Sequence, residues 1–246
     1  MTQKEIYAAH GIEFDGTYLI SPIGPVKPLL KQGNAKVGKT VWTWSMPAGK
    51  SGTCCCDCTG CYAKTGRYNQ PSVTDCLSRH KTLVEYALSW VHSAIAAQLE
   101  IIGPAEIRIH AAGDFHTSNE REYMAMWKSL VQEFPASKFW TYTKVEAAES
   151  LFDGISNAHI VPSIIPDHGV NYGHCGYIIE TYTALKAAGK SVYICRCGID
   201  KNQHCANCGH CLSSHYVLFL EHSTEYRPQK DQRYSEFVAL VNAQGE

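Results

Sequence analysis

The residues best suited to chemistry are five cysteines crowded into one short segment. Cys54, Cys58 and Cys61 have the spacing C-x3-C-x2-C. Three thiolates can hold three irons of a 4Fe–4S cluster and leave the fourth iron open, whereas structural metal sites generally close with four protein ligands. The spacing therefore predicts a metal centre with an open position for a substrate or cofactor. Cys55 and Cys56 supply further thiols, so other ligand triplets remain open.

A second group of cysteines lies near the C-terminus. The four thiols that best make one site are those of Cys195, Cys205, Cys208 and Cys211. Four thiolates close an auxiliary 4Fe–4S cluster or an ordinary structural zinc site, with Cys197 as another fourth ligand and His204 or His210 as substitutes at zinc. The C-x2-C-x2-C run favours a cluster, because that spacing is common in ferredoxin-type ligation.

Zinc is also the alternative at the first cysteine group, where it would only stabilise the loop. Zinc ribbons normally offer C-x2-C pairs in a small domain, whereas this triplet lies within a long β/α pattern, so ligand type and spacing favour iron–sulfur. Ten of the twelve cysteines fall in residues 54–61 and 195–211. Such crowding suits metal ligation in a reducing cytoplasm better than disulfides in a secreted protein.

The composition limits the possible classes of function. Of the 246 residues 45% are hydrophobic, which is enough for a core without disulfide staples. The 22 basic and 23 acidic residues give a formal net charge of −1, so charge does not indicate nucleic-acid binding. The N-terminus lacks a signal-peptide pattern, and no apolar run is long enough to cross a bilayer. We expect a soluble cytoplasmic protein with no membrane partner.

Alternating strands and helices must position the cysteines. Strands are predicted at residues 41–46, 106–110, 138–143, 159–163, 191–195 and 216–220. Helices are predicted at residues 82–99, 117–134, 146–152, 177–188 and 234–241, the second with Thr117 and Glu120 in capping-box spacing. This order is typical of parallel β/α units and predicts an α/β fold, a partial (β/α)6 TIM-like barrel.

The predicted elements divide the chain into three regions. Residues 1–40 form an irregular N-terminal segment with one short strand near residues 17–20, and residues 41–194 form the barrel core. Residues 195–246 form a cysteine-rich auxiliary region that ends in a helix. In such folds the reactive groups lie in loops after the carboxyl ends of strands, and both cysteine groups fall in such loops.

Residues 33–40 match the P-loop pattern G-x-x-x-x-G-K-S/T. A phosphate-binding loop needs an apolar strand before it and a helix after it, because the helix N-terminus helps to bind the phosphates. Here Pro25 and Pro28 precede the motif and a β-like segment follows it. The context is against nucleotide binding and indicates that Lys36 and Lys39 face solvent.

The spacing of Cys54, Cys58 and Cys61 after a first strand resembles that of the radical S-adenosylmethionine (radical SAM) enzymes. In that superfamily the second strand ends in a Gly-Gly-Glu-like turn, and Gly113-Asp114-Phe115 stands at the corresponding place. The resemblance implies a 4Fe–4S cluster whose open iron binds S-adenosylmethionine, in a barrel of radical SAM type. The cysteines near the C-terminus resemble auxiliary cluster ligands of the same enzymes.

The radical SAM resemblance also implies roles for particular residues. Gly113, Asp114 and Phe115 would bind the amino group of the methionine moiety, with Asp114 as acceptor, while Lys144 and Ser163 would meet its carboxylate and the ribose. His110, next to the turn, is a candidate catalytic contact. An electron donor such as flavodoxin or ferredoxin would reduce the cluster, and the resulting 5′-deoxyadenosyl radical would act on an unknown substrate.

Across most of residues 33–212 the chain also resembles an uncharacterised family of phage and plasmid proteins. The motifs are Gly-Asn-Ala-Lys36, Pro-Ala-Gly-Lys50, Cys-Tyr-Ala63, His-x-x-Gly-Asp-Phe115 and the final C-x2-C-x2-C. This resemblance implies a mobile-element origin. It supports a second hypothesis of a different class, a noncatalytic zinc- or iron–sulfur-binding protein of a phage that contacts nucleic acid or a host protein.

Overall fold

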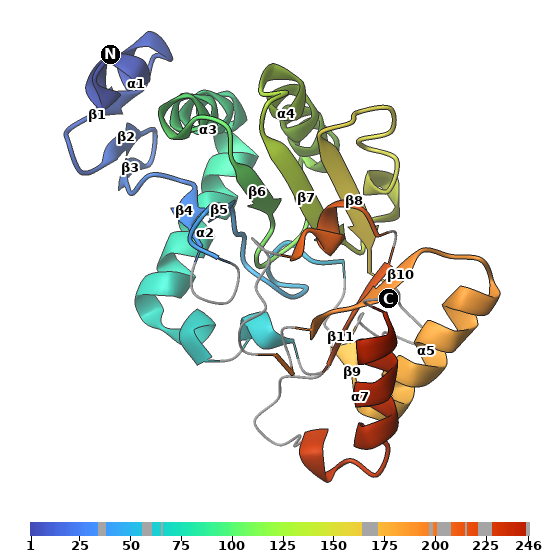
Figure 1. Cartoon of the computed structure of the whole chain (residues 1–246). Helices are drawn as coiled ribbons and strands as arrows, with labels where there is room; N and C mark the ends of the chain where they lie inside the picture. Colours follow the sequence, from blue (N-terminus) through green and yellow to red (C-terminus); the bar gives the residue numbers. More distant parts are fainter. Residues whose placement is uncertain are drawn as a thin grey trace.

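The computed structural model describes most of the chain. The described residues are 1–33, 38–55, 61–64, 66–163, 172–196, 199–200, 208–214, 216–220 and 228–244. Within them the strands form three sheets (Figure 1). Cys56, Cys58, Cys197, His204 and Cys205 lie outside the described residues.

The largest sheet carries most of the predicted strands. Its order is β4 (Lys31–Gln32), β5 (Val41–Thr43), β6 (Glu106–Ile109), β7 (Lys138–Thr143) and β8 (Ala158–Pro162). Strands β5 to β8 are parallel, while β4 pairs antiparallel with β5 at the edge. The parallel strands therefore bring the loops after β5, β6, β7 and β8 to one edge, as the β/α pattern predicts.

Three helices share one core with this sheet. They are α2 (Pro71–Tyr86), α3 (Leu88–Ile102) and α4 (Glu120–Glu133). Alternation along the strands decides which side chains meet them, because successive residues of a strand point to opposite faces. Phe139 packs in the core with the helices, whereas its neighbour Trp140 packs on the opposite face against the second sheet.

Two helix predictions in this region were wrong in detail. The helix predicted at residues 82–99 is two helices, separated at Ala87, whose backbone leaves the helical region at φ −144° and ψ 43°. The apolar stripe continues through this break, so periodicity alone did not reveal it. Helix α4 begins after Asn119, and the hydroxyl of Thr117 donates to the Asn119 side chain (3.1 Å) in place of the predicted capping box.

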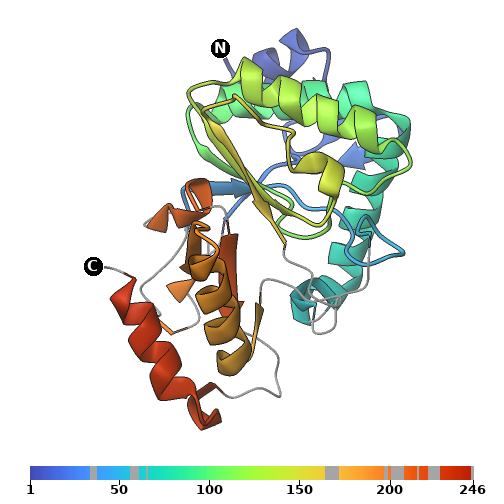
Figure 2. The ribbon, with the colours of Figure 1, turned by 90° about the vertical axis from the view of Figure 1, so that its right-hand side faces the viewer.

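A second, smaller sheet lies beyond the carboxyl ends of the first (Figures 1 and 2). Its parallel strands are β10 (Val192–Ile194), β11 (Tyr216–Leu220) and β9 (Tyr172–Gly173), in that order. Helices α5 (Cys175–Ala187) and α7 (Tyr234–Ala243) pack together against it. Their apolar residues share one core with β10 and β11, so the segment before the second cysteine group packs with the C-terminal segment.

The N-terminal segment is more regular than predicted. It forms α1 (Gln3–Ala9) and an antiparallel meander of β1 (Glu13–Phe14), β2 (Leu19–Ser21) and β3 (Gly24–Val26). Its large apolar side chains are separated by polar residues and turns, so no long period marks the strands; burial of Leu19 and Val26 against the main core stabilises them.

Strands β4 and β5 show which elements flank the P-loop pattern at residues 33–40. They form a hairpin in which the amide of Gly33 donates to the carbonyl of Val41. A strand, rather than a helix, follows the motif, as the sequence indicates. Lys39 is exposed, as predicted, and Lys36 lies outside the described residues.

Short 3-10 turns complete the described structure. They are η1 (Tyr62–Lys64), η2 (Gly66–Asn69), η3 (Glu146–Ala148), η5 (His210–Leu212) and η6 (Pro228–Lys230). The helix predicted at residues 146–152 is thus a single turn. No sheet closes into a barrel within the described strands, so the TIM-like barrel and its regional boundaries stay predictions. Among the described helices none is long and apolar enough to cross a membrane.

Candidate functional site

The first cysteine group begins in a tight loop after β5. The hydroxyl of Thr53 donates to the carbonyl of Pro47 (3.0 Å), and the amide of Cys54 donates to the carbonyl of Gly49 (3.2 Å). Gly52 is required here, because a Cβ atom at that position would overlap the carbonyl oxygen of Pro47. Hydrogen bonds within the loop therefore fix the direction of the backbone at Cys54.

The Gly-Asp-Phe turn after β6 packs directly on this loop. Gly113 has a φ of 80°, and a Cβ atom there would lie 2.6 Å from the Cβ of Met46. The amide of Asp114 donates to the hydroxyl of Thr53 (3.0 Å). The structure thus brings together the cysteine loop and the turn that the sequence places at the ends of neighbouring strands.

The carboxylate of Asp114 is buried and bound within the protein. One oxygen accepts hydrogen bonds from the Thr143 hydroxyl (2.6 Å) and the Phe115 amide (2.8 Å), and the other accepts one from the Lys144 amide (2.8 Å). Burial raises the pKa of Asp114, and these hydrogen bonds oppose the rise. The contacts tie the turn after β6 to the end of β7, which is a structural task; the predicted contact with an amino group stays a prediction.

Cys54 and Cys55 of the first group lie near Lys144, at the end of β7. Cys55 donates to the carbonyl of Lys144 (3.6 Å between sulfur and oxygen). Burial raises the pKa of Cys54 to about 12, and the charges of Asp114, Lys144 and Cys61 also act on it. These three groups therefore lie within electrostatic reach of Cys54. A metal would have to displace the thiol proton to bind there.

The other residues predicted at this site lie at the same edge. Ser163 directly follows β8, where its amide donates to the carbonyl of Thr143 (2.7 Å). Phe115 is fully buried and packs edge-on against the ring of His110, with the ring centroids 4.5 Å apart. Gly113, Lys144 and Ser163 thus lie at the ends of three adjacent strands, as the β/α pattern predicts.

His110 lies in an unusual backbone and side-chain environment. Its φ of 57° is in the left-handed region, and the residue is 2% exposed. Its Nε2 pairs with the hydroxyl of Tyr123 (2.8 Å), which also accepts from the indole of Trp44 (2.7 Å). Burial lowers the pKa of His110 to about 3, so its imidazole is neutral at neutral pH. The structure places it inside the core, and its catalytic role stays a prediction.

The second cysteine group surrounds two tyrosines. Tyr142 of β7 donates its hydroxyl to the sulfur of Cys211 (2.6 Å), and Cys208 lies 4.0 Å from the hydroxyl of Tyr193 on β10. Cys195 follows β10 and packs in the same cluster. The described thiols therefore converge where the two sheets meet.

The pKa shifts of the residues around these tyrosines also place the thiols close to them. Burial raises the pKa of Tyr142 well above its ordinary range, and the charges of Cys211 and Cys195 add to the effect. The ring of His210 stacks on Tyr193 with the centroids 3.7 Å apart, and burial lowers the pKa of His210. A neutral imidazole can bind zinc, so His210 is still able to replace one cysteine ligand, as predicted for a zinc site.

The described thiols fit part of a metal site. No group of three or more His, Cys, Asp and Glu side chains is arranged to hold a metal among the residues that the structure describes. Cys195, Cys208 and Cys211 are all described and pack in one cluster without forming such a group, while Cys205 of the second set and Cys58 of the first lie outside the described residues. The donors present are thiols, the ligand type that zinc and iron–sulfur clusters select. The thiol donors therefore fit either zinc or an iron–sulfur cluster.

Sequence reasoning missed some residues that hold the site together. The pattern pointed to the cysteines, but not to Thr53 or Tyr193, which contact them or their loop. Thr53 precedes the first cysteine and Tyr193 lies two residues before Cys195. A polar residue beside a predicted ligand at a strand end is the signal that could have found them.

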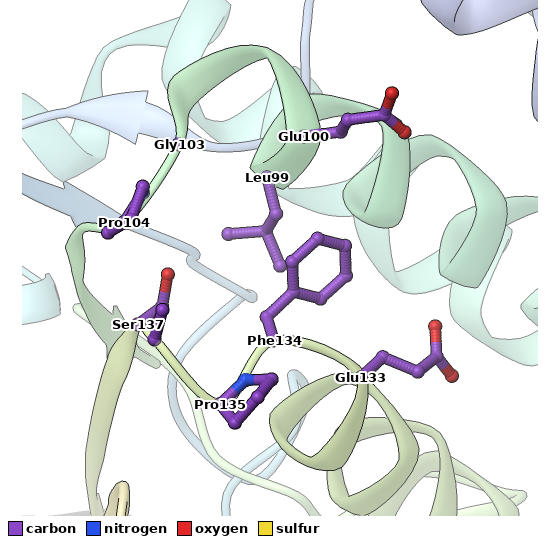
Figure 3. A pocket seen from close by; sticks show the side chains of 9 residues that line it. Leu99, Glu100, Gly103, Pro104, Glu133, Phe134, Pro135 and Ser137 are labelled. Atoms are coloured by element: carbon purple, nitrogen blue, oxygen red, sulfur yellow. The ribbon is translucent and has the colours of Figure 1, made fainter.

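A small hollow of about 220 Å³ is lined by residues of α3, α4 and the loops that follow these helices (Figure 3). Leu99 and Phe134 meet inside it, and Pro104 and Pro135 line its rim, while the carboxylate of Glu133 points away. It sits in the loops before β6 and β7, at the amino ends of the strands. Ligands of parallel α/β sheets bind at the opposite ends, so the hollow is not part of the candidate site.

Comparison with known proteins identifies a family. The family described as Gene product 88 matches residues 28–224. The chain belongs to the Gene product 88 family. The Gene 88 proteins of Mycobacterium phages L5 and D29 are each 28% identical, over 136 and 137 residues that make up 47% of this chain. The match covers 54% and 55% of those relatives, so the chain spans about half of their length. No solved structure matches.

The family confirms the resemblance to phage proteins that the sequence suggests. It accounts for the motifs between residues 33 and 212, all of which lie within the matched range. Neither the family description nor the names of the two relatives states a reaction, a ligand or a partner. Function must therefore be inferred from the site.

Proposed function

We propose that this Gene product 88 family member is a metal-binding protein of a phage or related mobile element. Its two cysteine groups would each hold a metal, the first on Cys54, Cys58 and Cys61, the second on the thiols around Cys211. The observation that carries the proposal is the convergence of Cys195, Cys208 and Cys211 on the buried Tyr193 and the half-buried Tyr142, since thiols gathered from separate segments are typical of ligation.

Three consecutive residues at the end of β7 connect the two cysteine groups. Tyr142 contacts Cys211, Thr143 contacts Asp114, and the backbone of Lys144 contacts both Asp114 and Cys55. Because successive strand residues point to opposite faces, one strand end reaches both groups. Loss of either metal is therefore expected to disturb the same short segment.

Iron–sulfur and zinc remain the two candidate metals. Anaerobic purification with iron, sulfide and zinc quantified separates them, because thiolate-ligated iron colours the protein and zinc does not. The wild type should be compared with a Cys54/Cys58/Cys61 triple alanine variant and a Cys195/Cys208/Cys211 triple alanine variant. We expect each triple variant to lose one metal centre. A wild type that retains neither iron nor zinc after anaerobic preparation would contradict the proposal.

If the protein is noncatalytic, it would contact nucleic acid or a host protein. The balance of 22 basic and 23 acidic residues favours the protein partner, because nonspecific nucleic-acid binding depends on a basic field. Gel-shift titration at low and high salt with single- and double-stranded DNA tests this preference. Tight, salt-sensitive binding would reverse it.

A second candidate function is radical SAM chemistry at the first cysteine group. The observation that favours it is the packing of Gly113 and Asp114 on the cysteine loop, at the ends of adjacent parallel strands. A cluster with an open iron would supply reductive cleavage of S-adenosylmethionine. The protein's part would be to hold the methionine moiety against Lys144 and Ser163, both at the same edge of the sheet.

Reductive cleavage can be measured directly. Anaerobically reconstituted protein with dithionite and S-adenosylmethionine should release 5′-deoxyadenosine, and the Cys54/Cys58/Cys61 variant should not. Lys144→Ala should weaken binding of S-adenosylmethionine while retaining iron. Protein that holds about four irons at the first group but releases no 5′-deoxyadenosine would exclude this function and leave metal binding intact.

A further inference from the structure

The hydroxyl of Tyr142 has a specific relation to the second cysteine group. It donates to the sulfur of Cys211 across 2.6 Å, and Cys211 is buried. The oxygen comes from β7, in the large sheet, whereas Cys211 belongs to η5, a turn that precedes β11 and packs against β7 and β8. The hydrogen bond therefore crosses between two parts of the fold that are distant in sequence.

The ring of Tyr142 is held from two sides. The Arg108 guanidinium lies 5.2 Å from its centroid, and the ring of Phe219 meets it edge-on at 5.4 Å. Arg108 and Phe219 come from β6 and β11, so neighbouring strands of both sheets fix the direction of the hydroxyl. A donor held in this way costs little entropy when it meets its acceptor.

We propose that Tyr142 is a positioning residue that donates a hydrogen bond to a metal-bound Cys211 thiolate. The inference rests on the proposed metal binding at the second cysteine group. Residues that hydrogen-bond to a metal ligand orient that ligand and change the affinity for the metal. Hydrogen bonds to sulfur also help to set the reduction potential of iron–sulfur clusters. Tyr142 thus takes the place of a solvent donor at a sulfur that the fold has buried.

Tyr142→Phe tests the proposal, because phenylalanine keeps the ring and removes only the hydroxyl. The full-length protein is purified anaerobically, and its metal content is titrated against a chelator of known affinity. We expect metal at the second group to be bound about 10- to 100-fold more weakly, the usual cost of losing an outer-shell partner. If the metal is an iron–sulfur cluster, its midpoint potential should also fall, a change that lost packing alone would not produce.

Two further variants complete the design. Tyr86→Phe is the matched control, since Tyr86 is 83% exposed and lies on α2, away from the cysteines. Cys211→Ala removes the acceptor atom, so adding Tyr142→Phe to it should change metal affinity by less than about twofold if the hydroxyl acts through that sulfur. A full further loss would mean that Tyr142 acts by another route and would overturn the proposal.

The remaining outcomes separate this proposal from the one on which it rests. If wild type binds metal that the Cys195/Cys208/Cys211 variant lacks, and Tyr142→Phe binds it with unchanged affinity and spectrum, the role of Tyr142 is wrong and metal binding stands. If wild type and the triple cysteine variant hold the same metal content, both proposals fail at the second group.

Discussion

The two cysteine groups are held by different kinds of interaction. The first rests on a polar network of backbone amides, hydroxyls and one buried carboxylate, centred on Asp114. The second rests on aromatic rings and two tyrosine hydroxyls, centred on Tyr142 and Tyr193. A buried polar network fails when any member is removed, because its partners are left without hydrogen bonds. An aromatic cluster loses packing more gradually.

The largest expected effect comes from removing the centre of the polar network. Asp114→Ala leaves the Thr143 hydroxyl and the amides of Phe115 and Lys144 without their acceptor, so the free energy of unfolding should fall by about 4 kcal/mol. Urea denaturation of both proteins measures this. Asp153→Ala, at an exposed position, is the control and should change stability by less than about 0.5 kcal/mol. Equal effects of the two variants would contradict the network.

Acid should weaken the first region through buried histidine. His80 on α2 stacks on Trp44 and pairs with the carbonyl of Ser45, and burial lowers its pKa from 6.5 to about 4. The unfolded chain binds more protons between these values, so stability falls as the pH drops through 6.5 and the loss is complete below 4. The shift corresponds to about 3 kcal/mol.

His80→Gln should flatten this part of the stability profile, measured as urea midpoints between pH 7 and 4. His92→Gln is the control, because His92 is a partly exposed residue on α3. The raised pKa of Asp114 acts with the opposite sign: its contribution to stability falls as the pH rises above its ordinary value of 3.8. An unchanged profile in His80→Gln would show that this histidine is not the acid-sensitive group.

Gly113→Ala should test how closely the turn packs on the cysteine loop. The alanine would meet Met46 at 2.6 Å and adopt a φ of 80°, and we expect a loss of about 2 kcal/mol, measured by thermal unfolding. Gly154→Ala has the same backbone strain, at a φ of 76°, with no atom within 4 Å. The difference between the variants isolates the contact. No difference would mean that the turn and loop can separate freely.

The smallest expected effects separate the two groups on one strand. Thr143→Val removes a hydrogen bond to Asp114 and should cost about 1 kcal/mol of unfolding free energy while leaving metal at the second group unchanged. Tyr142→Phe should do the reverse, with weaker metal binding at the second group and nearly unchanged stability of the first. Metal analysis and urea denaturation on both variants measure this. If each variant affected both groups equally, the strand end would act as one unit.

Local patterns along the chain determine much of the fold. The strands predicted at residues 138–143 and 216–220 match β7 and β11, because β-branched and aromatic residues of a half-buried strand dominate both segments. The cysteine spacing and the Gly-Asp-Phe turn are also visible in the sequence, since both depend on residues close to one another along the chain. Their common edge follows from the parallel order of strands.

Other features were beyond local reasoning. The break at Ala87 falls within a continuous apolar stripe, and the N-terminal meander consists of strands too short for a recognisable period. Packing between distant segments decides both. The hydrogen bonds from the Asp114 amide to Thr53 and from Tyr142 to Cys211 join residues 61 and 69 positions apart, respectively.

The sequence by itself determined which residues carry the chemistry: thiols at ligand spacing, a Gly-Asp-Phe turn, and strands in parallel order. Tertiary structure alone decided what surrounds them. It buries Asp114 and His110 inside the protein, because the turn after β6 folds over the cysteine loop. It also places Tyr142 and Thr143 on opposite faces of one strand, so that each reaches a different cysteine group. Such contacts depend on the packing of distant elements, which no local pattern encodes.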